Sequence, residues 1–130
     1  MSSQRSRPPL SEAQLELMNI LWQFGEGTVA DVLEQVRLRR EISRNTVQTM
    51  LSRLLEKGWL THREAVGGAF VYTPAVPREQ VQRQVLSKVV DTVFNGSASG
   101  ILMALLRDRS LSRKEADEIR RMIKDAEDRR

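Results

Sequence analysis

The chain has 130 residues, of which 40% are hydrophobic and 29% charged, and its formal net charge is +4. This is the size of one typical domain or of two small ones. It has no cysteine and a single histidine, His62, which excludes disulfides, thiolate metal sites, cysteine nucleophiles and metal sites built on two histidines.

Targeting and catalytic signals are lacking as well. No stretch approaches the roughly 18 apolar residues of a membrane span, and residues 1–9 do not carry the apolar core of a signal peptide. We therefore expect a cytoplasmic protein without membrane insertion. There is no nucleophile-elbow sequence, and Gly67-Gly68 lacks the spacing and the following lysine of a phosphate-binding loop. We expect no catalytic residue, no cofactor and no metal, and hence no enzyme.

The first part of the chain predicts an arm and two helices. Residues 1–9 are polar, basic and end in prolines, which is typical of a flexible arm. Ser11 with Gln14 forms a capping-box pattern ahead of an apolar stripe that runs to Gly25. Thr28 offers the next N-cap, and a short second helix follows it.

A third helix, capped by Ser43, has a clean division of faces. One side gathers Val47, Met50, Leu51, Leu54 and Leu55. The other side is short, polar and nearly free of acid, which suits a DNA major groove, where such side chains reach base edges. The residues we assign to this DNA-binding face are Ser43, Arg44, Asn45, Thr46, Gln48, Thr49, Ser52 and Arg53. An ordinary amphipathic surface helix is the alternative.

A glycine cap and a hairpin follow this helix, and they favour the interpretation that its polar face binds DNA. Gly58 stands at the C-cap, and strands over residues 59–64 and 69–73 flank a turn at Gly67-Gly68. Helix, glycine cap and hairpin in this order predict a winged helix-turn-helix over residues 10–75. We expect Leu60 and Tyr72 to close its core. His62 lies on the wing, where a position near phosphate is favoured over a catalytic role.

The overall charge balance does not single out residues 1–75 as the DNA-binding part of the chain. Residues 1–75 hold nine Lys or Arg against eight Asp or Glu, and the remainder holds twelve against nine. Local clustering says more, because Arg37, Arg39, Arg40 and Arg44 are interrupted only by Glu41 among charged residues. Such a cluster can bind DNA phosphate groups. We therefore add Arg40 to the residues predicted to bind DNA. A solvated turn explains the cluster equally well when it is judged alone.

Residues 76–130 predict three further helices, over 78–94, 98–106 and from Ser112 to Ala126. Their broad apolar stripes occupy too little chain to be buried in isolation, so we expect a homodimer whose two-fold symmetry matches a palindromic site. A monomer that folds this region onto its own winged helix is the alternative. The predicted dimerisation residues are Val81, Val85, Val89, Val93, Ile101, Leu105, Ile119 and Ile123.

The fold class is therefore mostly α with a small β-hairpin wing, a winged helix-turn-helix followed by a three-helix dimerisation region. The preferred function is sequence-specific repression of transcription on double-stranded DNA. The alternative is a winged-helix module for protein-protein interaction. An acid-poor face without aromatic or methionine anchors favours DNA.

Several segments carry a family resemblance that extends over nearly the whole chain beyond residue 9. Thr46-Val-Gln-Thr49 followed by Arg53-Leu-Leu-Glu-Lys-Gly58, and the later Phe94-Asn-Gly-Ser97, resemble the penicillinase-repressor family of BlaI/MecI type. The resemblance implies a homodimeric bacterial repressor on a palindromic operator, ahead of resistance or stress genes and often beside a membrane sensor protease. It assigns DNA contacts to Thr46, Thr49 and Arg53.

Departures from the family pattern limit this transfer. Gly68 stands where relatives often have a wing arginine, and the absence of cysteine excludes copper sensing through a C-terminal cysteine cluster. Relatives are cleaved at an Asn-Phe bond, whose counterpart, counted back from Leu111-Ser-Arg-Lys-Glu115, is Ala104-Leu105. The required residue pair is absent there. Release from DNA by cleavage with altered specificity is slightly favoured over release by another signal.

Overall fold

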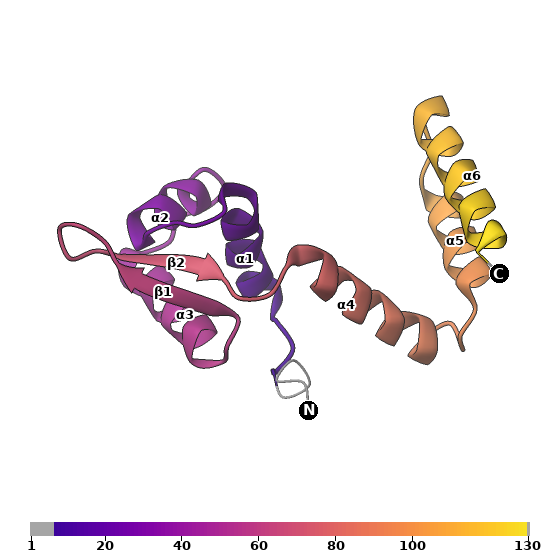
Figure 1. Ribbon diagram of the computed structural model, residues 1–130. Helices are drawn as coiled ribbons and strands as arrows, with labels where there is room; N and C mark the ends of the chain where they lie inside the picture. The colour runs from indigo at the N-terminus through magenta and orange to yellow at the C-terminus, as the bar shows by residue number, and fades with distance from the viewer. Residues whose placement is uncertain (1–6, 130) are drawn as a thin grey trace. The chain divides into compact units, whose positions relative to one another are not determined.

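The computed structural model describes residues 7–129. The chain divides into two compact units, one ending at Arg83 and the other beginning at Gln84, and each is described by itself (Figure 1). Their elements in chain order are α1 (Glu12–Phe24), α2 (Val29–Arg37), α3 (Arg44–Glu56), β1 (Leu60–Glu64), β2 (Phe70–Pro74), α4 (Arg78–Thr92), α5 (Ala98–Asp108) and α6 (Arg113–Asp128). The predicted mostly helical fold with a hairpin wing is confirmed.

Helix starts follow from local hydrogen bonds between residues three apart. Ser11, Thr28 and Ser112 each accept a hydrogen bond from the third residue of their helix, whose own side chain accepts one from the cap backbone. These are complete capping boxes, which satisfy N–H groups that have no partner inside the helix. Ser43 and Ser97 cap α3 and α5 with a single side-chain bond each.

The wing is an antiparallel hairpin in which Leu60 pairs with Pro74. Its turn is closed by a 2.7 Å hydrogen bond from the Ala65 amide to the Ala69 carbonyl. Gly67 and Gly68 have φ angles of 94° and 87° there, a region open to glycine. The sequence did not predict that Gly27, between α1 and α2, bridges Tyr72 of β2 with hydrogen bonds of 3.0 and 2.8 Å.

The core of the first unit joins α1, α2, α3 and the hairpin. Leu60 and Tyr72 are buried in it, as predicted. The segment after β2 is fixed to α1, because Trp22 Nε1 donates to the Val76 carbonyl at 2.8 Å. The buried residues of this core are Leu17, Met18, Leu21, Val32, Leu33, Val36, Val47, Leu51, Leu54, Trp59, Leu60, Tyr72, Val76 and Val81.

The second unit has a different character. Within residues 84–129 every side chain is exposed or only partly buried. Large apolar side chains stand in water on all three of its helical segments, among them Val85, Leu86, Met103, Leu106 and Met122. A helical unit of this kind has no buried core of its own.

Candidate nucleic-acid interface

The face of α3 predicted to bind DNA is exposed along its length. Val47, Leu51 and Leu54 are buried in the core, which turns the opposite side of the helix to solvent. That side forms a shallow depression of about 380 Å³, lined by Asn45, Gln48, Thr49, Ser52, Arg53 and Glu56. Glu56, an acid at the end of the face, was not predicted from the sequence to belong to it. The remaining members are neutral polar groups and an arginine, which can donate to and accept from base edges.

The N-terminus of α3 holds one of the predicted contact residues in place. Ser43 Oγ accepts a hydrogen bond from the Thr46 amide at 3.1 Å. The two side-chain hydroxyls lie 2.8 Å apart and share a hydrogen bond. The Thr46 hydroxyl is therefore oriented by the helix cap, and its position is defined before any ligand arrives.

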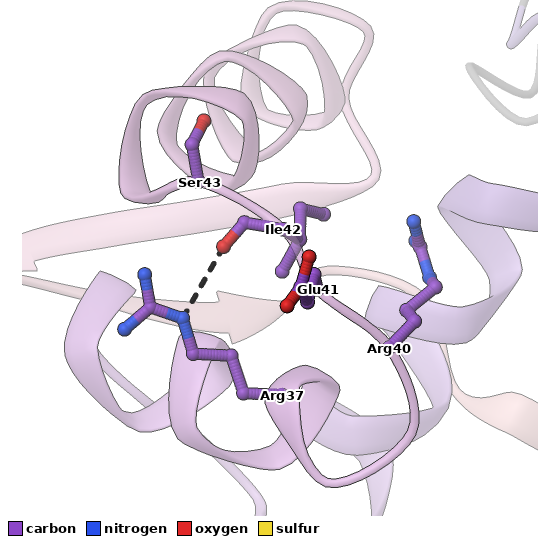
Figure 2. Close-up of a pocket in the computed structure, with 5 residues that line it drawn as sticks. All are labelled: Arg37, Arg40, Glu41, Ile42 and Ser43. Carbon is purple, nitrogen blue, oxygen red and sulfur yellow. Dashed lines mark hydrogen bonds between the residues drawn. The ribbon is translucent and has the colours of Figure 1, made fainter.

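The arginines of the turn between α2 and α3 are partly engaged (Figure 2). Arg37 Nε donates to the Ile42 carbonyl at 3.2 Å, and an Arg40 Nη2 atom lies 2.7 Å from Glu16 Oε1 on α1. Figure 2 shows the two guanidinium groups on opposite sides of the turn. Arg39 and Arg44 are exposed. The turn is a basic surface at the start of α3, as the sequence suggested, although Arg40 is paired with an acid.

The wing is braced by an ion pair that the sequence did not reveal. Arg63 donates to both carboxylate oxygens of Glu26 at 2.9 and 3.1 Å. The hydrogen bond from Arg63 holds the pKa of Glu26 below its usual value, and the same contact raises the pKa of Arg63. Both side chains are about half exposed, so the surrounding water screens the pair and weakens it.

His62 lies on the exposed part of the same hairpin. Its ring centroid is 4.7 Å from that of Phe70 and 5.9 Å from that of Tyr72. The side chain is exposed and packs on aromatic rings, which is compatible with a wing-surface role. At the tip, Val66 is fully exposed and Gly68 carries no side chain, so the tip offers no cation.

The opposite end of α3 is held by Arg7. Its Nε donates to the Gly58 carbonyl at 2.9 Å, and its guanidinium carbon lies 5.6 Å from the Trp59 ring centroid. Residues 1–6 lie outside the described residues. Arg7, within the predicted arm, therefore packs against the turn that ends the helix.

The predicted dimerisation residues fall into two environments. Val81 is 6% exposed and belongs to the core of the first unit, because the first turns of α4 pack against that unit. It is not available to a partner chain, and including it in the dimer stripe was wrong. The other seven are exposed or partly buried: Val85, Val89, Val93, Ile101, Leu105, Ile119 and Ile123.

The described residues contain neither a metal-binding cluster nor a membrane-spanning helix. Among residues 7–129, no group of three or more His, Cys, Asp or Glu side chains is arranged to hold a metal ion. No helix in the described part of the chain is long and apolar enough to cross a membrane.

Comparisons with known proteins place these features in a family. A family model described as penicillinase repressor matches residues 10–125. The penicillinase repressor of Bacillus licheniformis is 28% identical over 123 residues, 95% of either chain. The methicillin resistance regulatory protein MecI of Mammaliicoccus sciuri is 24% identical over 114 residues, 88% of this chain and 92% of its own.

A solved structure agrees with the sequence relatives. The solution structure of the DNA-binding domain of the repressor BlaI is 36% identical and superposes with a TM-score of 0.50, over 55% of this chain and 87% of that one. Because the family model covers well over half of its length, this chain belongs to the penicillinase repressor family.

Proposed function

We propose that this protein is a DNA-binding transcriptional repressor that acts as a homodimer on a palindromic operator in the bacterial cytoplasm. The observation that carries the proposal is the exposed, polar face of α3 within a winged helix-turn-helix. Members of this family are repressors and not enzymes. The alternative, a winged helix that binds only protein, is disfavoured because the α3 face presents no aromatic or methionine anchor.

The division of labour on DNA follows from side-chain chemistry. Thr49, Asn45 and Gln48 are exposed neutral groups on α3 that can read base edges in the major groove. Arg44 at the start of the helix and Arg37 before it can contact phosphate, which positions the protein without reading sequence. The helix N-terminus adds a favourable field for phosphate.

The homodimer is supported by the uncovered apolar side chains of the second unit. No side chain of residues 84–129 is buried, yet apolar groups recur along α4, α5 and α6. A second copy would remove them from water, and each buried CH₂ group contributes about 0.8 kcal/mol. Two-fold symmetry would then present two α3 helices to half-sites about one helical turn apart, roughly 34 to 36 Å, or a multiple of it.

Selection of bound sequences from random duplex DNA tests the function directly. We expect an enriched palindrome at moderate salt, and the repressor proposal fails if none is enriched. Thr49→Leu should weaken the selected site far more than a scrambled duplex. Thr92→Leu, the same change on an exposed residue of α4, is the matched control and should leave both affinities unchanged.

We propose that release from DNA involves cleavage within α5 by a partner protease. Its specificity would differ from that of the proteases that cleave relatives at an Asn-Phe bond. Ala104 and Leu105 are exposed, and Leu105 retains 42% of its accessibility. Their peptide bond lies inside a helix, so cutting requires local unfolding. Cleavage there would divide the proposed dimer interface.

Mass spectrometry of protein recovered from induced native cells tests this route. A fragment ending near Ala104 supports cleavage. Intact protein that has left its operator rules cleavage out and directs attention to a ligand or another signal.

A further inference from the structure

Arg40 lies between two depressions on the surface of the first unit. One, of about 660 Å³, adjoins the N-terminus of α3 and is lined by Arg37, Arg40, Glu41, Ile42 and Ser43. The other, also about 660 Å³, runs along α1 and is lined by Glu12, Ala13, Leu15, Glu16, Asn19, Arg39 and Arg40. Arg40 is the residue common to both, so its side chain has access to both surfaces.

In the structure Arg40 is committed to the α1 side. Its Nη2 atom lies 2.7 Å from Glu16 Oε1, and the side chains of Arg40 and Glu16 are 45% and 18% exposed. Figure 2 shows the Arg40 side chain directed away from Arg37. The Glu16 carboxylate is largely covered by its surroundings, whereas the Arg40 side chain remains accessible to solvent. A single ion pair of this exposure is weak and opens readily.

A DNA phosphate is an alternative partner for the same guanidinium, which makes a single hydrogen bond to Glu16 in the structure. Arginine binds phosphate through two parallel hydrogen bonds with full charge assistance. On the α3 side the phosphate would also meet Arg37 and the N-terminal end of the helix. The two partners, carboxylate and phosphate, therefore compete for one cation.

We propose that Glu16 holds Arg40 away from the DNA-binding surface and that DNA must displace it, so that Glu16 lowers DNA affinity through Arg40. The proposal rests on the proposed function and assigns to Glu16 a positioning role without any contact with DNA. The affinity for DNA then depends on Glu16 of α1, an acid that lies far from α3 in the sequence.

A double-mutant cycle tests the coupling. The variants are Glu16→Gln, Arg40→Ala and the double variant, with affinities measured by fluorescence anisotropy on the selected palindrome and on a scrambled duplex. Glu16→Gln should bind both duplexes about two- to five-fold more tightly, the range expected for release of an exposed ion pair. In the Arg40→Ala background the same substitution should have no effect. Arg40→Ala alone should weaken both duplexes.

Glu12→Gln is the matched control, since Glu12 lies one turn away on α1 and lines the same depression. Glu12→Gln removes the same charge and leaves the ion pair between Glu16 and Arg40 intact. Its effect on DNA affinity should therefore be smaller and should not depend on Arg40. Thermal unfolding of every variant verifies the fold.

Three outcomes would overturn the inference while leaving the proposed function intact. Glu16→Gln could tighten binding equally with and without Arg40, which would mean a general charge effect. It could weaken binding, which would mean that Glu16 orients Arg40 toward DNA, or it could change nothing. Failure of the proposed function differs from all three, because the folded wild-type protein would then enrich no palindrome from random duplex DNA.

Discussion

Val89→Asp separates folding of the protomer from assembly of the proposed dimer. Val89 lies on α4 beyond the part that packs into the first unit, and its side chain is only partly buried in the protomer. A carboxylate at this position therefore keeps contact with water as long as the chain is alone. We expect the substituted protomer to fold.

The free-energy cost of the substitution arises when two protomers associate. If a second copy covers Val89, the carboxylate loses its hydration without gaining a partner, at about 3 kcal/mol or more. A two-fold interface contains the substitution twice, which raises the penalty to about 6 kcal/mol. At 1.4 kcal/mol for each factor of ten, the dimer Kd rises about 10⁴-fold.

Sedimentation velocity over a range of concentrations measures this change, and circular dichroism checks the helix content. Ser87→Asp places the same charge on an exposed position of the same helix and should leave the dimer intact. Affinity for the full palindrome should fall toward that for a single half-site in Val89→Asp alone, because linked binding of two half-sites is lost. A folded Val89→Asp protein that remains dimeric at the wild-type concentration would refute the reasoning.

Three further predictions concern the first unit. Trp22→Phe removes the hydrogen bond to the segment after β2 and should lower the free energy of unfolding by about 1 kcal/mol, measured by urea denaturation; an unchanged midpoint would contradict it. Val81→Ala should cost about 2 kcal/mol in the same assay, because its side chain is buried, whereas Val85→Ala should cost little in a monomeric background. Arg63→Gln should raise the pKa of Glu26 toward its usual 4.5, seen by NMR titration of the carboxyl carbon. In the wild type this brace is present at neutral pH and is lost as the pH falls through the lowered pKa; equal titration curves would contradict the assigned cause.

Short-range features of this chain could be predicted from sequence because they depend on residues a few positions apart. Ser11, Thr28 and Ser112 each form a hydrogen-bonded box with the residue three positions later. The division of α3 into a buried and an exposed side likewise depends only on helical periodicity. The hairpin follows from its two glycines, which supply the positive φ angles of the turn.

Long-range pairings could not be predicted in this way. Glu16 and Arg40 are 24 residues apart and Glu26 and Arg63 are 37 apart, and nothing in either local sequence specifies the partner. Val81 illustrates a related limit. It continues the four-residue apolar spacing of Val85 and Val89, yet it packs in the first unit's own core. An apolar stripe predicts that a surface will be covered and leaves open which surface covers it.

The salt dependence of operator binding tests how many of the clustered arginines reach phosphate. The sequence alone offers five per protomer on the turn and on α3, which for a dimer implies a slope of log K against log salt of roughly −9. In the structure Arg39 lines the depression on α1 and not the one at the start of α3, which leaves Arg37, Arg40, Arg44 and Arg53. These four in each protomer give a slope of roughly −7. If Arg40 stays on Glu16 in the complex, two contacts are lost and the slope is roughly −5. Titrations of the palindrome at four or more salt concentrations distinguish these values, and Arg40→Ala should change a slope of −7 to about −5 while leaving a slope of −5 unchanged. The same measurement therefore shows whether DNA draws Arg40 away from its carboxylate, because an arginine that never leaves Glu16 releases no counterion from DNA.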